Sequence, residues 1–514
     1  MLERQPSCTG VDCRDFFADS KRNQRSERVF YVTNPPARYC SHIIHAGLRS
    51  RSNPKTGFRG PPPSELPVTN PSPYAAAALD VLFPAHLATL QDGTAQTLAA
   101  CGLDSLVVGA GALHFQFLDD QPYPFKSNPL FRQWAPILDA PNSFVCFTPG
   151  KKPLLIFMQP EDYWHKPPAL PTGAWLDNFE VRVTRAAAEA RHHLPSQGRT
   201  GYLGEVHAGL EHWGMAVNPE PLLNRMHYNR LTKTPYEIAC MRVASHKGAL
   251  AHRAAVAAFR AGQSEYAIHL AYLAATGHRE EELPYPNIIA LNEGGAILHY
   301  TDLSPHLPAA HLSMLIDAGA QCRGYASDIT RTTAATAGAF ADLVLAMEEL
   351  ELALCAQVVP GKHYPEIHLD AHLRLAQLLG EAGIIRGTPE SAVATGLSSV
   401  FFPHGIGHPL GLQVHDVGGF QAAPEGGTLD RPAGHPYLRL MRTLTEGAVV
   451  TIEPGIYFID LLLKAAQADG RGRDIVWERV EALRPYGGVR IEDNVVATAQ
   501  GAVNLTREAF ASLG

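Results

Sequence analysis

Hydrophobic and polar positions follow two different patterns along this chain after its first 75 residues. Residues 85–98 place apolar side chains at the spacing of an amphipathic helix, whereas the short apolar runs 106–108 and 154–158 are typical of buried strands. The same mixture continues to about residue 230. It predicts an α/β domain in this part of the chain.

A helix start signal follows that mixture. Thr234 is suited to be the N-cap, Pro235 takes the first helical position, and Glu237 completes a capping box three residues after the cap. We therefore place a domain boundary there. Residues 76–233 then form the N-terminal domain, and residues 234–514 form a second domain.

The second domain contains a weak internal repeat. The triplet Ile-His-Leu occurs at 268–270 and again at 367–369, each time shortly after a glycine that ends a helical stretch. Strand-like runs follow, at 287–291 and 296–301 in the first half and at 448–459 in the second. Helices followed by strands, twice over, predict an α+β fold with a duplicated unit whose antiparallel strands join in one sheet.

The first 75 residues differ in composition from the rest of the chain. They contain 11 Lys and Arg against 6 Asp and Glu, together with 10 of the 40 prolines. Such a segment buries little apolar surface, so we expect residues 1–75 to be a disordered N-terminal extension. A misassigned start codon is a second interpretation, and the arginines leave a transit peptide as a third.

Length and charge restrict the class of protein. With 514 residues and 46% hydrophobic composition, two folded domains are the default expectation. The net charge of −7 is mild, which argues against a nucleic-acid surface, and no apolar stretch reaches the roughly 18 residues of a membrane span. The eight cysteines are scattered singly. We expect a cytoplasmic protein that acts on a small molecule or peptide, without nucleic-acid or membrane partners.

Two aspartates in strand-like runs, Asp317 and Asp328, are the first candidates for chemistry. If the runs form a hairpin centred on the turn at 322–324, the two residues stand opposite each other and point to the same face. Two such carboxylates repel each other unless cations hold them, and a pair of divalent ions is a usual arrangement. The alternative is that both are solvated at the end of a hairpin.

Three histidines lie in a glycine-rich stretch of twelve residues, namely His404, His408 and His415. Imidazoles supply metal ligands and neutral proton carriers, and glycines let the backbone approach closely. Glu453 and Glu492 lie in apolar, strand-like surroundings, where an unpaired carboxylate is costly to bury. A salt bridge to a nearby arginine is the alternative explanation for each glutamate.

These motifs, in this order, resemble the five-ligand site of the pita-bread metallopeptidases, which include methionine aminopeptidase, aminopeptidase P and prolidase. The five matching residues are Asp317, Asp328, His408, Glu453 and Glu492. The chain is most similar to the bacterial Xaa-Pro dipeptidases, through the stretches 117–125, 290–300, 404–416 and 437–439. Those enzymes lack the extension, and the resemblance leads us to expect long loops at 421–438 and 460–486.

The resemblance implies a metallo-exopeptidase that hydrolyses the imide bond of dipeptides ending in proline, with a hydroxide between two metal ions as nucleophile. It implies that Asp328 and Glu492 bridge the ions, that Asp317 holds one ion, and that His408 and Glu453 hold the other. Four carboxylates and one imidazole favour Mn²⁺, with Co²⁺ or Zn²⁺ as alternatives. The resemblance also extends to enzymes that hydrolyse organophosphate triesters, which implies a possible side activity of that kind.

Further roles follow from the same resemblance. Glu453 would carry a proton to the leaving nitrogen, while His404 and His415 would hydrogen-bond the substrate and the tetrahedral intermediate. Arg439 and Arg490 would receive the substrate carboxylate, which favours dipeptides over longer peptides.

The remaining implied residues concern the pocket and the assembly. His299 and Tyr285 would line the substrate pocket, and Asp120 would reach the site of a neighbouring subunit in a homodimer. An aminopeptidase P and a non-catalytic pita-bread binding module are the rival interpretations. The first would accept longer peptides, and the second would lack the five ligands.

Overall fold

The computed structural model describes residues 76–206 and 210–514. The extension expected in residues 1–75 therefore lies outside the described residues. Within the described part of the chain, no helix combines the length and the apolar character that a membrane span requires.

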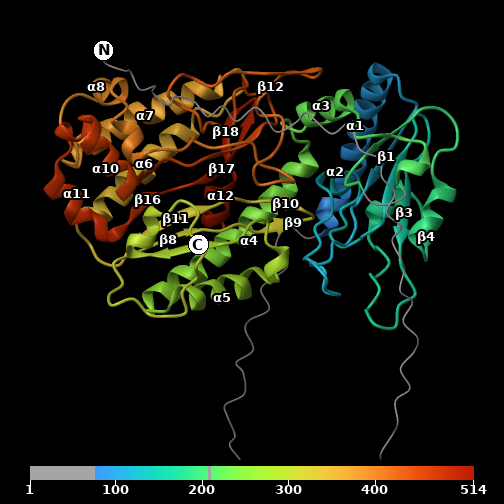
Figure 1. Cartoon of the computed structure of the whole chain (residues 1–514), viewed down its shortest axis with the longest axis horizontal. Helices are drawn as coiled ribbons and strands as arrows, with labels where there is room; N and C mark the ends of the chain where they lie inside the picture. The colour runs from blue at the N-terminus through green and yellow to red at the C-terminus, as the bar shows by residue number, and fades with distance from the viewer. Residues whose placement is uncertain (1–75, 207–209) are drawn as a thin grey trace, which may run out of the picture. The chain divides into compact units, whose positions relative to one another are not determined.

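One mixed six-stranded sheet forms in the N-terminal part of the described chain (Figure 1). Its strands lie in the order β4 (Glu180–Thr184), β3 (Leu154–Met158), β2 (Phe144–Phe147), β1 (Ser105–Gly109), β5 (Thr200–Leu203) and β6 (Ala216–Val217). Strands β1 and β2 are buried along their whole length, which explains why they are continuous apolar runs rather than alternating ones. The predicted strands at 106–108 and 154–158 are therefore confirmed.

Three helices accompany this sheet: α1 (Ala76–Cys101), α2 (Pro129–Trp134) and α3 (Glu220–Asn229). The predicted amphipathic helix lies within α1. The ring of Phe83 on this helix lies 6.0 Å from the ring of Trp175 and 5.2 Å from that of Tyr236, measured between centroids. Because Trp175 and Tyr236 come from opposite sides of residue 234, one apolar core spans that position.

The capping box that the sequence predicts begins helix α4 (Pro235–Arg260). The Thr234 hydroxyl accepts a hydrogen bond from the Glu237 backbone N–H at 3.4 Å, and the Glu237 carboxylate accepts one from the Thr234 N–H at 2.8 Å. The hydroxyl also lies 2.9 Å from Nδ1 of the buried His86 on α1. The cap therefore fixes the start of α4 against the first helix.

Two helices followed by a three-stranded antiparallel sheet occur twice in residues 235–514, as the internal repeat predicts. The first set is α4, α5 (Glu265–Thr276), β7 (Ile288–Leu291), β8 (Ser313–Asp317) and β11 (Thr330–Ala334). The second set is α6 (Ala339–Cys355), α7 (Tyr364–Glu381), β14 (Val449–Ile452), β17 (Asp493–Thr498) and β18 (Gly501–Asn504). The α+β architecture with duplicated units is therefore present.

Shorter elements complete this part of the chain. Three two-stranded pairs are β9 (Gln321–Cys322) with β10 (Tyr325–Ala326), β12 (Gln421–Ala423) with β13 (Gly426–Thr428), and β15 (Gly455–Tyr457) with β16 (Gly488–Arg490). The remaining α-helices are α8 (Pro389–Ala394), α9 (Ser398–Phe401), α10 (Asp460–Asp469), α11 (Trp477–Leu483) and α12 (Leu505–Ala511).

The hairpin expected around 322–324 forms, but its predicted register is wrong. Asp317 pairs with Thr330 rather than with Asp328. The reason is a two-residue turn, in which Arg323 and Gly324 both have positive φ, at 53° and 87°, so that the centre of the hairpin lies between them. Asp328 still lies on the Asp317 side, because Asp328 and Thr330 are two residues apart.

Three other expectations need correction. The antiparallel strands do not form one unbroken sheet, since the two three-stranded sheets are joined through an isolated bridge between Thr330 and Glu492. The run 296–301 is not a strand, because a 3-10 helix (Asn292–Ala296) containing two glycines directs the chain into a loop. The stretch 460–486 is not a loop, because it forms α10 and α11, which bury Leu463, Ala466, Val480 and Leu483.

The cap at Thr234 allows a direct test of its stabilising role. We expect Thr234→Ala to lower the free energy of unfolding by about 1 kcal/mol, because the Glu237 N–H loses its acceptor. Urea unfolding followed by circular dichroism measures the change. Thr89→Ala, at an exposed position within α1, is the control. Equal stability of the two variants would contradict the assigned role of the cap.

Candidate metal centre

The acidic side chains proposed as ligands all lie where a strand ends or is interrupted. Asp317 is the last residue of β8, and Asp328 precedes β11 by two residues. Glu453 separates β14 from β15, and Glu492 separates β16 from β17. Because the ladders are broken at these points, the side chains of both halves converge on one place in the interior.

Three of the five proposed ligands form a compact group. Ligand atoms of Asp328, His408 and Glu492 lie within 4.8 Å of one another, and all three residues are buried. The His408 Nε2 atom lies 3.4 Å from Asp328 Oδ2 and 3.8 Å from Glu453 Oε1. The structure therefore brings Glu453 to the same imidazole as Asp328. Glu492 has a partner of its own, because the Thr330 hydroxyl donates to its Oε2 atom at 2.7 Å.

Asp317 joins this group through two neighbours. The Tyr285 hydroxyl lies within hydrogen-bond distance of both Asp317 Oδ1 and Asp328 Oδ1, so it spans the two carboxylates. Arg490 donates from Nη2 to Asp317 Oδ2 at 2.7 Å. All five residues singled out in the sequence are therefore brought together, and Tyr285 and Arg490 lie among them.

The orientation of His408 suits a metal ligand. Its Nδ1 lies 3.0 Å from the carbonyl oxygen of Pro409, so an Nδ1–H donates there and Nε2 faces the carboxylates. Steric contacts decide which residue can precede His408. Gly407 has φ of 151°, and a Cβ atom built on it would lie 2.2 Å from the carbonyl oxygen of Thr451. Only glycine fits at this point of the loop.

Burial and mutual repulsion disturb the acids of this group. Burial raises the pKa of Glu453 to about 7, raises that of Asp317, and raises that of Glu492 well above its ordinary value. Burial acts in the same direction on Asp328, but the hydrogen bond and charge of His408 outweigh it and hold its pKa low. Four crowded carboxylates and one imidazole form a donor set that fits divalent cations.

His404 is held in a defined tautomer beside this group. Its Nδ1 lies 2.8 Å from the Gly405 carbonyl oxygen, and its Nε2 lies 2.8 Å from the Tyr457 hydroxyl. Arg490 donates to that same hydroxyl at 3.0 Å, which directs the hydroxyl hydrogen to His404. Burial lowers the pKa of His404 to about 3, so the ring is neutral. The Nδ1 atom of this ring lies 3.7 Å from Glu453 Oε2, so His404 lies next to Glu453.

His415 packs directly against the proposed ligand His408. The two ring centroids lie 4.4 Å apart, with the rings inclined at 83°. Burial lowers the pKa of His415 to about 4, and the charges of His408 and Arg439 act in the same direction. The next residue, Asp416, is buried and pairs with Arg230 and with Lys233, so the loop that carries His415 is held in place.

The proposed substrate residues have different surroundings. His299 and Arg439 are exposed, and both lie near enough to affect the pKa of His415. Arg490 is buried and pairs with Asp317, so its nearest anion in the structure is an acid of the site itself. Asp120 is exposed and accepts a hydrogen bond from Gln121 at 3.0 Å. A single chain does not test the expected contact of Asp120 with a neighbouring subunit.

Sequence reasoning missed several residues that shape the site. Tyr457 orients His404, and Thr330 donates to Glu492. The Asn494 side chain accepts a hydrogen bond from the Asp328 N–H at 3.2 Å. A usable signal existed for Tyr457, because residues separated by an even number along an extended segment share a face, and Tyr457 follows Glu453 by four. Asn494 carried no such signal, since its partner is 166 residues away.

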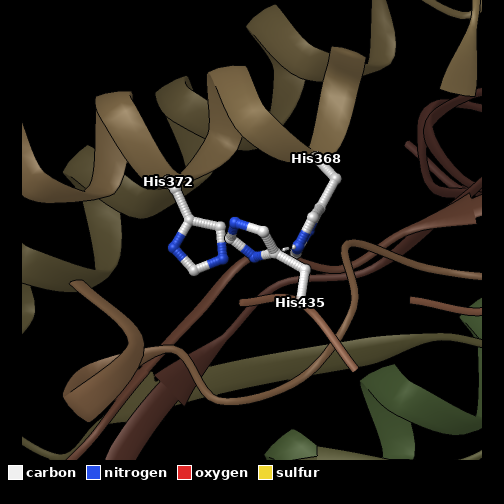
Figure 2. A group of neighbouring side chains, drawn as sticks. All are labelled: His368, His372 and His435. Atoms are coloured by element: carbon white, nitrogen blue, oxygen red, sulfur yellow. Dashed lines mark hydrogen bonds between the residues drawn. The ribbon is translucent and has the colours of Figure 1, made fainter. Parts of the chain in front are cut away.

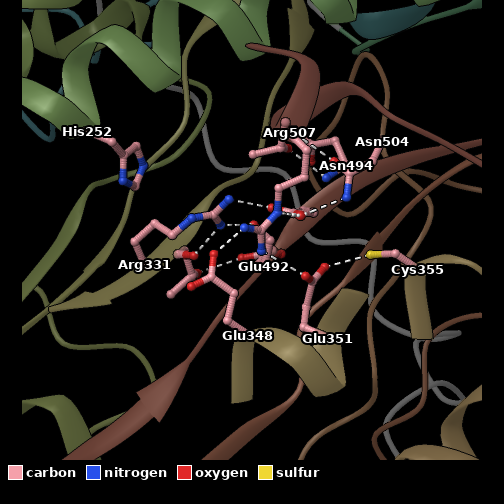
Figure 3. A network of polar contacts seen from close by, with 12 residues as sticks. His252, Arg331, Glu348, Glu351, Cys355, Glu492, Asn494, Asn504 and Arg507 are labelled. Carbon is pink, nitrogen blue, oxygen red and sulfur yellow. Dashed lines mark hydrogen bonds and ion pairs between the residues drawn. The ribbon is translucent and has the colours of Figure 1, made fainter. Parts of the chain in front are cut away.

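A buried ion-pair network supports the backbone of Glu492 (Figure 3). Arg331 donates to the Glu492 carbonyl oxygen at 2.8 Å and pairs with Asp493 at 2.6 Å. Arg507 pairs with Asp493 and with Glu351, which also accepts a hydrogen bond from the Cys355 thiol. Removing one member of such a network costs about 3–5 kcal/mol, because its partners remain buried and charged.

A cavity of about 1110 Å³ lies beside the site. Phe125 and Arg132 line it from the N-terminal part of the chain, and Pro284 and Val414 line it from the C-terminal part. The last two residues adjoin Tyr285 and His415 in sequence, whereas none of the five proposed ligands lines the cavity. A cavity of this size accommodates a small ligand.

Two comparisons of the sequence with known proteins agree. Residues 239–499 match the family described as metallopeptidase family M24, and residues 81–228 match the N-terminal domain of Xaa-Pro dipeptidase. The Xaa-Pro dipeptidase of Stenotrophomonas maltophilia strain K279a is 51% identical over 433 residues, which cover 84% of this chain and 98% of that protein. The Xaa-Pro dipeptidase of Xanthomonas euvesicatoria pv. vesicatoria strain 85-10 is 49% identical over 85% of this chain and 99% of that protein.

Solved structures give a more distant match. Aminopeptidase P from E. coli with the inhibitor Pro-Leu aligns with a TM-score of 0.63 at 22% identity, over 84% of this chain and 97% of that chain. The zinc-substituted E. coli enzyme in complex with product aligns over the same shares with a TM-score of 0.62 at 23% identity. Similarity at this level of identity shows the shared fold.

The raised pKa of Glu453 predicts how the metal-free protein responds to pH. The folded protein holds this proton more tightly than the unfolded chain. The resulting stability is therefore full below about pH 4.5 and is lost as the pH rises through about 7. We expect the unfolding temperature of chelator-treated protein to fall across this window, and divalent cations to restore it at the upper end.

Scanning calorimetry across this pH range measures the effect, with Glu453→Gln as the matched control. The amide does not titrate, so the variant should lose less stability than the wild-type chain over the same window. An equal loss in both proteins would show that Glu453 does not hold this proton.

Proposed function

Because this chain belongs to metallopeptidase family M24 and to its Xaa-Pro dipeptidases, we propose that it hydrolyses the imide bond of dipeptides with a C-terminal proline. The observation that carries the proposal is the convergence of four carboxylates and one imidazole at the interrupted ends of strands from both halves of the fold. The identity to Xaa-Pro dipeptidases over almost their whole length supports the choice of substrate.

Two divalent metal ions are the proposed cofactors, with Mn²⁺ first and Co²⁺ or Zn²⁺ as alternatives. Asp328 and Glu492 would bridge the two ions, Asp317 would complete one position, and His408 with Glu453 would complete the other. Such a pair of ions, when bound, activates a water molecule and polarises the scissile carbonyl. The predominance of oxygen donors supports Mn²⁺ over softer metals.

The residues of the chain supply the proton transfers. Glu453 would accept a proton from the attacking water and deliver it to the proline nitrogen. The Tyr457 hydroxyl contacts His404 and accepts a hydrogen bond from Arg490, which fixes the His404 ring. A fixed ring supports a role for His404 in holding the substrate. His415, neutral and packed on His408, would donate to the oxygen on which negative charge develops.

Substrate length would be set by cations near the site. The exposed guanidinium of Arg439 would receive the C-terminal carboxylate of a dipeptide, and His299 would line the same side. Arg490 has a second role in the proposal, because its pairing with Asp317 fixes that ligand. Tyr285 would orient Asp317 and Asp328 besides lining the pocket.

Other parts of the proposal concern organisation and location. We propose an N-terminal domain at 76–233, a catalytic domain at 234–514, a homodimer in which Asp120 reaches the partner's site, and a cytoplasmic location. The two matched family regions, 81–228 and 239–499, support the domain boundary. Hydrolysis of organophosphate triesters stays a prediction.

The decisive test compares Ala-Pro with Ala-Pro-Ala on chelated protein reloaded with Mn²⁺, Co²⁺ or Zn²⁺. We expect hydrolysis of Ala-Pro that requires added metal and is highest with Mn²⁺. Asp328→Asn should lower kcat/KM by more than about 100-fold, since losing a ligand exceeds the usual cost of losing a residue that supports one. Released proline provides the measurement.

The matched control is Asp302→Asn, which removes an exposed carboxylate outside the site. It should leave kcat/KM unchanged. Efficient cleavage of Ala-Pro-Ala without cleavage of Ala-Pro would assign the chain to the aminopeptidase P type of activity. Full activity in metal-free protein would refute the metal centre.

Arg439 provides a separate test of substrate length. We expect Arg439→Gln to raise KM for Ala-Pro about tenfold or more while changing kcat less, because a charge-assisted hydrogen bond to the substrate carboxylate is lost. Steady-state kinetics measure both constants, and Arg386→Gln, at an exposed position on another loop, is the control. An unchanged KM would remove Arg439 from the substrate site.

A further inference from the structure

A second cluster of ligand-type side chains lies outside the carboxylate centre (Figure 2). It consists of His368 and His372 on helix α7 and His435 on the loop that follows β13. A separation of four residues places the two helix histidines on one face of α7, and Figure 2 shows the His435 ring entering between them from the opposite side. One nitrogen of each ring lies within 4.8 Å of a nitrogen of the other two.

The geometry of the three rings resembles a set of ligands rather than a stack. His368 Nε2 lies 2.9 Å from His435 Nδ1. The centroid of the His372 ring lies 4.7 Å from that of His368 and 4.6 Å from that of His435, and the rings are inclined at 88° and 62°. The rings are therefore not stacked in parallel, and one nitrogen of each lies close enough to the other two to share an ion.

Among the described residues, the facing nitrogens of His368 and His435 share one hydrogen bond, which a bound ion would replace. His372 Nδ1 lies 3.0 Å from the Ser398 hydroxyl, so the other nitrogen of this ring, which points toward His435 in Figure 2, carries the lone pair. His368 Nδ1 is buried without a hydrogen-bond partner among the described residues. That ring is therefore not held by a second bond. Metal binding would require this ring to turn slightly, so that Nε2 and His435 Nδ1 separate to the about 3.4 Å spacing of a tetrahedral zinc site.

The surroundings keep the imidazoles neutral, as metal ligation requires. His368 and His372 are each 1% exposed, and burial lowers their pKa values to about 2 and about 3. His435 is partly exposed, which gives a cation a way in. The cluster of Glu351, Cys355 and Asp493 differs, because Arg331 and Arg507 already neutralise its acids.

We propose that His368, His372 and His435 bind one late divalent transition-metal ion, with Zn²⁺ as the best match, at a site separate from the carboxylate centre. Three imidazoles suit zinc, nickel and copper, whereas the oxygen-rich centre favours manganese. The ion ties α7 to the loop that carries Arg439, four residues after His435. The ring of Phe402 lies 5.0 Å from His372 and 4.7 Å from His404, so this residue separates the cluster from the catalytic histidine.

The experiment counts tightly bound zinc in the full-length chain carrying Asp328→Asn, which weakens the carboxylate centre. Equilibrium dialysis against buffered Zn²⁺, with bound metal measured by mass spectrometry, should find one tight equivalent. Adding His435→Gln should weaken that equivalent by at least about tenfold, and His368→Gln should do the same. The same Zn²⁺ should raise the unfolding temperature of the parent protein and not of these variants.

His306→Ala, an exposed histidine outside the cluster, is the control and should keep the tight equivalent. Cleavage of Ala-Pro by His435→Gln in the otherwise wild-type chain verifies that the variant is folded. Unchanged zinc binding in His435→Gln and in His368→Gln would overturn the proposal. Should Asp328→Asn retain additional tight zinc at the remaining carboxylates, the loss of one equivalent in His435→Gln would still support the histidine site.

Discussion

The mutual repulsion of buried carboxylates is the constraint on which the rest of this structure depends. Asp317, Asp328, Glu453 and Glu492 lie in one interior region, and burial alone would make their charged forms unfavourable. The chain offsets part of this cost with Arg490 on Asp317 and with the Tyr285 hydroxyl between the two aspartates. Protons or divalent cations would supply the remainder, so we expect the stability of this region to depend on pH and on metal.

The fold meets this constraint by interrupting its strands. The bridge between Thr330 and Glu492 brings the two sheets together where their ladders are broken. Backbone groups that have no ladder partner at these breaks bond to side chains instead. The Asn494 side chain, for example, accepts a hydrogen bond from the Asp328 N–H. Arg331 and Asp493 hold the start of the strand that follows Glu492. This fixed backbone keeps Glu492 close to the other acids despite their repulsion.

Local signals predicted several of the elements, and the family resemblance indicated the five proposed ligands, but neither gave the exact strand pairing. The capping box at Thr234 and the buried run 154–158 depend on neighbouring residues, and both were predicted correctly. The pairing of Asp317 with Thr330 depends on a turn in which Arg323 adopts positive φ. The local sequence does not indicate this conformation. Contacts between distant residues, such as Asn494 with Asp328, depend on the completed fold and cannot be derived from spacing alone.

The two candidate metal sites differ in the way the chain keeps each set of donors ready. At the carboxylate centre the donors repel one another, so arginine, tyrosine and histidine must hold them, and a bound cation relieves the strain of burial. At the histidine cluster the donors are neutral, and desolvation favours the neutral form that a metal requires. A cation gains much more electrostatic attraction at the first site than at the second. Selection of the metal at the histidine cluster must therefore come from nitrogen donors and ring geometry rather than from charge, which is why a late transition metal is the better match there.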